Sequence, residues 1–126
     1  MEVVDYAIKP TQKGLVVMNT PGSDIFSMTG MAAGGAVMVL FTTGRGTPAG
    51  FPIVPVIKIA TNTEMFNKMI DDMDVNAGAL LSEEKHIATM AGELFELVRR
   101  TAEGELTKAE KNLQDIFSIH TVGPAF

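Results

Sequence analysis

The apolar positions of the chain form three uninterrupted runs in the first half and one long amphipathic stretch in the second. Runs in which successive residues are apolar suit strands covered on both faces, as in a parallel sheet. The pattern predicts such strands at 14–18, 36–41 and 53–60. Between the first two, residues 24–33 have room for about two to three helical turns, with Ser23 or Asp24 as the N-cap. This order predicts a short βαβ unit.

The second half is predicted to be mainly helical. Apolar residues recur from 82 to 102 at the i, i+3, i+4, i+7 spacing of an amphipathic helix, which Gly104 ends. Glu83 and Glu84 in its first turn and two arginines in its last turn suit the helix dipole. Shorter elements are predicted as a helix at 63–69, a capping box at Thr107–Glu110 that opens a brief helix, and a last strand at 116–119.

These elements predict one α/β domain over residues 1–126. We expect a single three-layer domain with a mainly parallel sheet and flanking helices. No internal repeat, linker or low-complexity segment interrupts it.

Composition excludes several classes of function. The 126 residues include 10 basic and 15 acidic residues, and such an acidic chain lacks the clustered cations that bind nucleic acid. With no cysteine and 2 histidines, thiol nucleophiles, iron–sulfur clusters and multi-histidine metal sites within the chain are excluded. The longest apolar stretch, 30–41, is shorter than the roughly 20 residues of a membrane helix, and no signal-peptide pattern opens the chain. We therefore expect a cytoplasmic protein that binds neither nucleic acid nor membranes.

The charges are unevenly distributed. Residues 1–60 hold four basic and three acidic residues, a net charge of +1, whereas residues 61–126 hold six and twelve, a net charge of −6. The electrostatic potential therefore favours binding of a small anion by the first half of the chain.

The segment Phe41-Thr-Thr-Gly-Arg-Gly46 directly follows the second predicted strand. Ligands of open α/β sheets bind outside the carboxyl ends of the strands. Glycines there let backbone N–H groups approach an anion, and Arg45 can hold a carboxylate through two hydrogen bonds. The pattern favours a pocket for a small anion. The alternative is a tight turn whose Arg45 faces solvent; a P-loop is excluded because no Gly-Lys-Ser/Thr follows.

Polar residues also follow the other two predicted strands. If all three strands belong to one parallel sheet, their ends converge on one edge. That edge then brings together Thr20, Thr42, Thr43, Arg45 and Asn62. The alternative is three ordinary polar turns.

An acidic run at 71–76 is a second candidate. In an extended segment Asp72, Asp74 and Asn76 lie on one face and can ligate a hard cation such as Mg²⁺ or Mn²⁺. The alternative is a solvated acidic turn; we favour that interpretation for Asp71 and a functional role for Asp74. His86 and His120 are interpreted as surface residues.

Five segments together carry a resemblance to a known family: 14–22, 29–35, 41–46, 55–62 and 72–78. The most specific are Thr42-Thr-Gly-Arg-Gly46 and, at a fixed distance, Lys58-Ile-Ala-Thr-Asn62. They resemble the C-terminal portion of the altronate/galactarate dehydratase family, which includes a sulfolactate sulfo-lyase branch. The resemblance continues through residues 102–110 and so covers nearly the whole chain.

The resemblance implies elimination chemistry on sugar acids. Family members dehydrate altronate or galactarate to a 2-keto-3-deoxy acid with a divalent metal such as iron or manganese, and the related branch eliminates sulfite from sulfolactate. Such a reaction needs a base for the proton α to a carboxylate, an acid or metal at the leaving group, and cationic donors for the enediolate.

The resemblance also suggests roles for residues of this chain. Arg45, with Thr42, Thr43, Gly44 and Gly46, would hold a carboxylate or stabilise the enediolate. Lys58 would do the same only if its side chain reaches the pocket. Asp74 would serve as an acid/base or metal-ordering group and Asn62 as a substrate contact.

Two departures from the family limit this interpretation. Members often carry Asp where Asn19 stands, and they are several times longer, with Cys- and His-containing metal-binding segments upstream of this portion. We therefore expect a chain that is incomplete alone and works with an upstream domain or partner subunit, or as a homo-oligomer. The alternatives are a non-catalytic module that binds a small carboxylate and an assembly domain.

Overall fold

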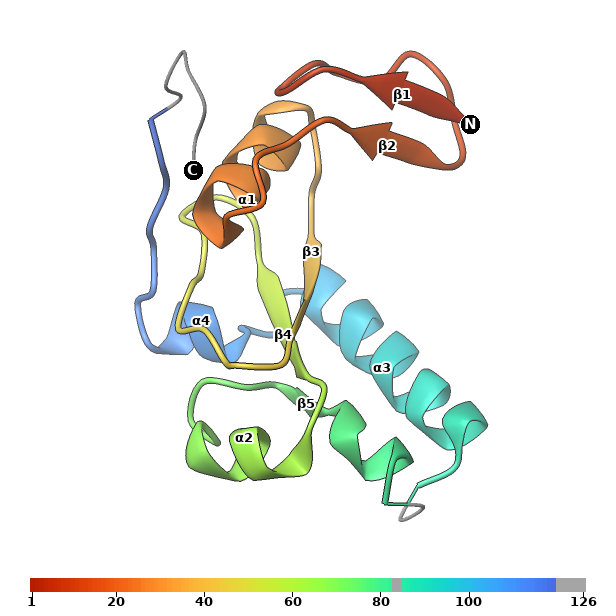
Figure 1. The fold of residues 1–126 in the computed structure, drawn as a ribbon, viewed down its shortest axis with the longest axis vertical. Coiled ribbons are helices and arrows are strands. Elements are labelled where there is room, and N and C mark those ends of the chain that lie inside the picture. Colours follow the sequence, from red (N-terminus) through yellow and green to blue (C-terminus); the bar gives the residue numbers. More distant parts are fainter. Residues whose placement is uncertain (83–84, 120–126) are drawn as a thin grey trace.

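The computed structural model describes residues 1–82 and 85–119 as two small parallel sheets with helices around them (Figure 1). The helices and strands follow one another along the chain as β1 (Glu2–Val4), β2 (Val16–Met18), α1 (Asp24–Ala33), β3 (Val39–Thr43), β4 (Val56–Ala60), α2 (Thr63–Lys68), β5 (Val75–Asn76), the 3₁₀ helix η1 (Ala77–Leu80), α3 (Ile87–Ala102) and α4 (Lys108–Lys111).

The larger sheet has the order β3-β4-β5, and all of its pairs are parallel. Val39 is paired with Val56 and Thr43 with Ala60, so the carboxyl ends of β3 and β4 lie side by side. All residues of β4 are buried, and α4 and α3 lie to either side of this strand (Figure 1). The predicted α/β class with a parallel sheet and flanking helices is confirmed.

The first predicted strand lies outside this sheet. Its residues form β2, which pairs in parallel with β1 in a sheet of two strands, Glu2 opposite Val16. The Glu2 carboxylate closes the connection between them by accepting the backbone N–H groups of Thr11 (3.1 Å) and Gln12 (2.9 Å). The expected convergence of three strand ends is therefore wrong for Thr20, whose hydroxyl contacts Ser27 instead (3.1 Å).

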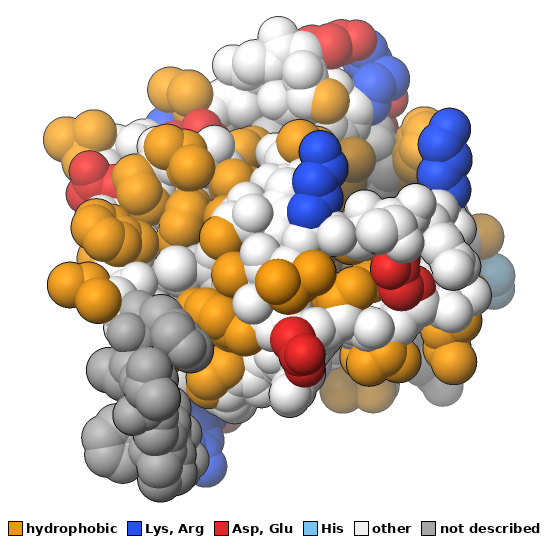
Figure 2. All heavy atoms as spheres, turned by 90° about the horizontal axis from the view of Figure 1, so that it is seen from above, with side chains coloured by type: hydrophobic (Ala, Val, Ile, Leu, Met, Phe, Trp, Pro, Cys, Tyr) orange, Lys and Arg blue, Asp and Glu red, His pale blue; other side chains and the backbone are white. Residues whose placement is uncertain are grey.

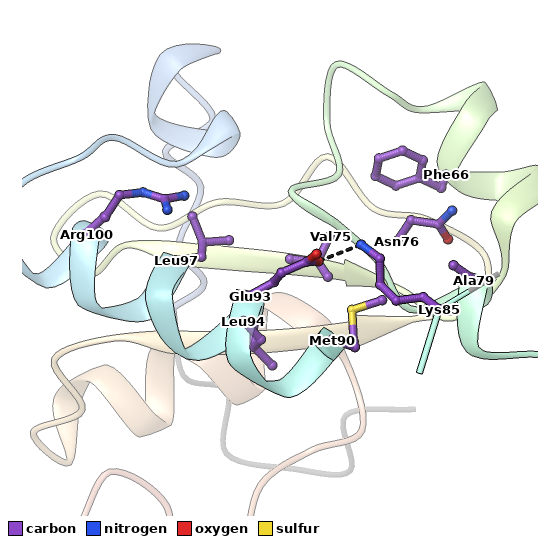
Figure 3. Close-up of a pocket in the computed structure, with 10 residues that line it drawn as sticks. All are labelled: Phe66, Val75, Asn76, Ala79, Lys85, Met90, Glu93, Leu94, Leu97 and Arg100. Carbon is purple, nitrogen blue, oxygen red and sulfur yellow. Dashed lines mark hydrogen bonds and ion pairs between the residues drawn. The ribbon is translucent and has the colours of Figure 1, made fainter. Parts of the chain in front are cut away.

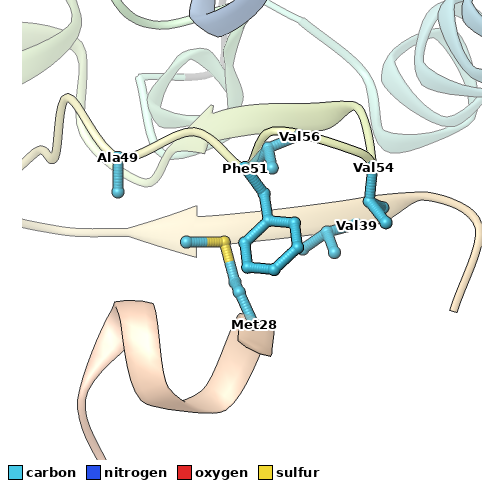
Figure 4. Close-up of a cluster of buried hydrophobic side chains, with 6 residues drawn as sticks. All are labelled: Met28, Val39, Ala49, Phe51, Val54 and Val56. Atoms are coloured by element: carbon cyan, nitrogen blue, oxygen red, sulfur yellow. The ribbon is translucent and has the colours of Figure 1, made fainter. Parts of the chain in front are cut away.

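Helix α1 packs against the larger sheet through one apolar face. Met28 is fully buried there among Val39 of β3, Val56 of β4 and the β3–β4 connection (Figure 4). The connection adds Phe51, whose ring lies beside Met28. This core fixes α1 beside β3, so the start of the helix comes close to the end of the strand.

A second face of α1 carries glycines and packs against the β1–β2 unit. A Cβ at Gly30 would lie 2.4 Å from the Tyr6 ring, and one at Gly34 would lie 2.5 Å from the end of the Met18 side chain. The Tyr6 hydroxyl donates a hydrogen bond to the Phe26 carbonyl (2.9 Å). Glycine at position 30 allows the Tyr6 ring to lie directly on the helix backbone, and glycine at position 34 makes room for the Met18 side chain.

The second half differs from the predicted pattern at two places. Helix α3 begins at Ile87 instead of 82, because the His86 side chain accepts the N–H of Ala88 and caps it there. Glu83, Glu84 and His120 lie outside the described residues. The predicted strand at 116–119 is wrong: the segment pairs with no strand of the described sheets, and Ser118 donates its N–H to the Thr29 hydroxyl (3.1 Å). The capping box at Thr107–Glu110 is confirmed.

Hydrophobic side chains remain exposed at the end of the molecule that carries the β1–β2 unit (Figure 2). Large exposed side chains of this part of the chain are Val3, Ile8, Leu15, Val17 and Val37. Within the described ranges, the structure has no helix with the length and apolar character to span a bilayer.

Two helical glycines are expected to respond to alanine in opposite ways. Gly30→Ala forces the Tyr6 ring off α1 and is expected to cost about 1–3 kcal/mol of unfolding free energy. Gly92→Ala, in α3, meets nothing within 4 Å and is expected to stabilise the protein by about 0.5–1 kcal/mol. Urea denaturation measures both, and equal effects of one sign would contradict this packing.

Candidate functional site

A shallow hollow of about 500 Å³ lies where β3 ends and α1 begins. The hollow is lined by Asp24, Phe41, Thr42, Thr43, Gly44, Arg45 and Gly46. All but Asp24 belong to the predicted anion-binding segment, and we call its residues 42–46 the Thr42–Gly46 loop. The structure thus places this loop at the carboxyl end of a parallel strand, where ligands of open α/β sheets bind.

The loop is held by local hydrogen bonds and by a close packing contact. The Gly46 N–H donates to the Thr43 hydroxyl (3.0 Å), and the Thr61 N–H donates to the Thr43 carbonyl (3.0 Å). Gly46 has a φ of +83° and sits so close to Met69 that a Cβ would lie 2.2 Å from its sulfur. Only glycine combines this backbone conformation with such an approach.

Asn62 joins the loop to helix α2. Its side-chain oxygen accepts the N–H of Met65 (2.8 Å) as the helix N-cap, and its side-chain nitrogen donates to the Gly44 carbonyl (2.8 Å). The amide is therefore engaged at both ends. Asn62 lies beside the loop, as the sequence predicts, and in this structure its contacts position the loop backbone.

Arg45 and Asp24 supply the charges of the hollow. Arg45 is exposed and Asp24 half-buried, and neither forms an ion pair within the described part of the chain. Asp24 is also the first residue of α1, so the positive end of the helix dipole is adjacent. A guanidinium beside a hydroxyl-rich loop can hold a carboxylate, and a carboxylate on the same hollow can accept a proton.

Lys58 does not share these surroundings. It is 0% exposed in the middle of β4, and its ammonium donates to the Pro48 carbonyl (3.2 Å) and the Gln114 side-chain oxygen (2.7 Å). Burial lowers the pKa of this ammonium, an effect that the nearby carboxylates of Asp72 and Asp74 oppose. The structure thus places Lys58 inside the protein.

The residues of the acidic run turn toward separate partners. Asp74 accepts the backbone N–H groups of Lys58 (2.8 Å) and Lys108 (2.9 Å), one on each oxygen. Asp72 accepts the Gln114 amide (2.6 Å), and the Asn76 amide donates to Thr63 (3.2 Å). Among residues 1–82 and 85–119, no three acidic or histidine side chains gather as a metal site. The donors described here do not form a site for a divalent metal.

A second hollow, of about 450 Å³, lies between α3 and the segment that forms β5 and η1 (Figure 3). Its lining mixes apolar side chains, such as Leu94 and Met90 of α3, with polar and charged ones. The Lys85 ammonium is paired with Glu93 (2.6 Å), and Arg100 at the other end is paired with Glu105 (2.7 Å). Because its cations are already neutralised, this hollow suits an anion less well than the one at Arg45.

Asp24 is the residue of the hollow that the sequence did not identify as functional. The sequence indicated only a helix N-cap at Ser23 or Asp24; in the structure Ser23 is the N-cap and Asp24 is the first residue of α1. One feature of the sequence could have indicated a functional role for Asp24. It stands where a predicted helix begins after a predicted strand, and in a βαβ unit the start of the helix lies near the carboxyl edge of the sheet. Because α1 packs against β3, the first residue of the helix lies beside the carboxyl end of that strand, and this contact is not visible in the sequence.

Comparison with known proteins places the chain in a family. Residues 1–125 match the model of the C-terminal portion of D-galactarate/altronate dehydratases. The chain is 39% identical over 120 residues to galactarate dehydratase (L-threo-forming) of Escherichia coli K12, covering 95% of this chain and 22% of that protein. It is 39% identical over 111 residues to altronate dehydratase of Bacillus subtilis 168, covering 88% and 22%.

A third relative is named for a different leaving group. The (2R)-sulfolactate sulfo-lyase subunit beta of Chromohalobacter salexigens is 36% identical over 108 residues, which cover 86% of this chain and 28% of that protein. The chain thus spans 22–28% of the length of these relatives. With nearly every residue matched, the chain belongs to the D-galactarate/altronate dehydratase family, of which it represents the C-terminal portion.

Proposed function

We propose that this chain holds the carboxylate of a sugar acid of the galactarate or altronate type during its dehydration. The observation that carries the proposal is Arg45, a cation with no acidic partner in the described part, on the Thr42–Gly46 loop at a parallel strand end. A guanidinium can form two charge-assisted hydrogen bonds with a carboxylate. The names of two relatives support a sugar acid as the ligand.

The reaction we propose is the loss of water across two adjacent carbons. A base removes the proton from the carbon next to the carboxylate. The hydroxyl group on the neighbouring carbon accepts a proton from an acid and leaves as water. The resulting enol rearranges to a 2-keto-3-deoxy acid. Negative charge accumulates on the carboxylate oxygens as the proton is lost, so Arg45 interacts more strongly with the transition state than with the substrate.

We assign the proton transfer to Asp24 in preference to Asp74. Asp24 lines the same hollow as Arg45 and has no ion-pair partner in the described residues. Both oxygens of Asp74 already accept backbone N–H groups. A carboxylate in that situation is poorly placed to take a proton from a substrate.

The rest of the active site is proposed to come from outside this chain. A divalent metal such as iron or manganese would polarise the carboxylate or the leaving hydroxyl, and we propose that its ligands lie in an upstream domain or partner subunit. The exposed side chains of Val3, Leu15 and Val17 in and beside the β1–β2 strands support such a contact, since exposed apolar patches mark sites of protein contact.

A second candidate is the elimination of sulfite from sulfolactate. The 36% identity to a sulfo-lyase subunit favours it. The first step is the same removal of a proton next to a carboxylate, and only the leaving group differs. Both proposed reactions therefore use the same contact between Arg45 and the carboxylate. Which acid binds most tightly distinguishes between the two reactions.

Replacing Arg45→Gln is expected to weaken galactarate binding about tenfold, because one charge-assisted contact is worth roughly 1.5–3 kcal/mol before solvent screening. Calorimetric titration of the chain with galactarate, altronate and sulfolactate measures this and identifies the acid. Lys13→Gln removes the same charge from an exposed site outside the hollow and is expected to change nothing. Equal binding by the Arg45 variant and the parent would refute the role of Arg45.

Replacing Asp24→Asn is expected to tighten binding of the same acid about two- to threefold, because a negative charge leaves the hollow. The gain should shrink as salt rises. Asp5→Asn is the matched control, an exposed acid outside the hollow. Weaker binding by Asp24→Asn at every salt concentration would show instead that the Asp24 carboxylate accepts a hydrogen bond from the ligand or only supports α1.

A further inference from the structure

Lys58 is a buried cation whose position has no explanation in hydrophobic packing. It lies in a strand of otherwise apolar residues and is 0% exposed. Transfer of an ammonium group from water to the protein interior costs several kcal/mol unless other groups replace its hydration. An apolar side chain at this position would avoid that cost, so the contacts of the ammonium indicate what it contributes.

The contacts join three segments that are distant in sequence. The ammonium donates to the Pro48 carbonyl (3.2 Å), in the chain that leaves the Thr42–Gly46 loop, and to the Gln114 side chain (2.7 Å), beyond α4. Gln114 in turn donates to Asp72 (2.6 Å). The positive charge of Lys58 is thus balanced through Gln114 by the acidic run that precedes β5.

The chain that leaves the loop also packs closely against the backbone of Gln114. Gly50 lies so close to the C-terminal segment that a Cβ there would stand 1.9 Å from the Gln114 carbonyl oxygen. Between Gly46 and Gly50, the Ala49 N–H donates to the Thr47 hydroxyl (3.2 Å) and the Pro48 carbonyl faces Lys58. The loop is therefore held at two points: Asn62 donates to the Gly44 carbonyl within it, and Lys58 donates to the Pro48 carbonyl just after it.

We propose that Lys58 is a positioning residue, which sets the conformation of the Thr42–Gly46 loop from inside the protein through the Pro48 carbonyl and Gln114. It acts on the ligand only through the loop. The proposal deepens the proposed function, because the carboxylate site on this loop is the one that Lys58 supports.

Hydrogen exchange of the intact 126-residue chain tests this without any ligand. In Lys58→Met, the Gly46 and Ala49 amides are expected to exchange at least tenfold faster, while the amides of β1 and β2 stay unchanged. Gln114→Leu keeps the lysine but removes its shorter hydrogen-bond acceptor, so it is also expected to speed exchange at Gly46 and Ala49. This variant provides the test if Lys58→Met does not fold. Val4→Ala is the control: it loosens a buried contact in the other sheet and should leave the Gly46 and Ala49 amides protected.

Galactarate titration of the same variants then separates this inference from the proposed function. Lys58→Met and Gln114→Leu are expected to weaken binding about tenfold, and Val4→Ala is not. If the parent does not bind galactarate, the proposed function fails, and the exchange result still tests Lys58. Unchanged exchange at Gly46 and Ala49, or an equal increase in every segment, would overturn the positioning role.

Discussion

The Asp74 carboxylate is the contact on which the second half of this fold depends. One oxygen accepts the N–H of Lys58 in the middle of β4, and the other accepts the N–H of Lys108 at the start of α4. The Asp74 N–H in turn donates to the Lys58 carbonyl (2.9 Å). A single side chain thus fixes the edge of the sheet against the central strand and places α4 beside it. Without Asp74 the Lys58 N–H would lack a hydrogen-bond partner, because water does not reach this buried strand.

The contacts around Asp74 are hydrogen bonds, and there is a physical reason why hydrophobic contacts alone would not suffice here. The β3-β4-β5 sheet is small, and β5 contributes only Val75 and Asn76, so strand pairing alone fixes little of the chain after β4. Hydrophobic contacts hold segments together without fixing their register, whereas hydrogen bonds to a carboxylate act over a narrow range of distance and direction. Asp74 supplies this precision for α4, and Lys58 supplies it for the chain beyond the loop.

The sequence predicted the elements that hydrophobic patterns define, and it failed where tertiary contacts decide. Helix α1, strands β3 and β4 and the capping box follow from runs, spacing and capping residues. Strands β1 and β5 are three and two residues long, too short for any period to appear. Because β1 was not recognised, its partner β2 was assigned to the larger sheet, and Thr20 was placed at the wrong edge. For the candidate site, the Thr42–Gly46 loop and Asn62 were found from glycines and hydroxyls after a strand, and the structure brings them together.

The two aspartates show why roles at the site could not be predicted from sequence. Asp24 opens a helix and Asp74 precedes a strand, so each has an ordinary structural explanation. What separates them is how their oxygens are used. Both oxygens of Asp74 serve backbone amides, so a change in its protonation would disturb β4 and α4. Helix α1 begins without a side-chain cap hydrogen bond, and Asp24 lines the same hollow as Arg45. A group that must gain and lose a proton in each cycle is better placed where the fold does not depend on its charge, and this favours Asp24.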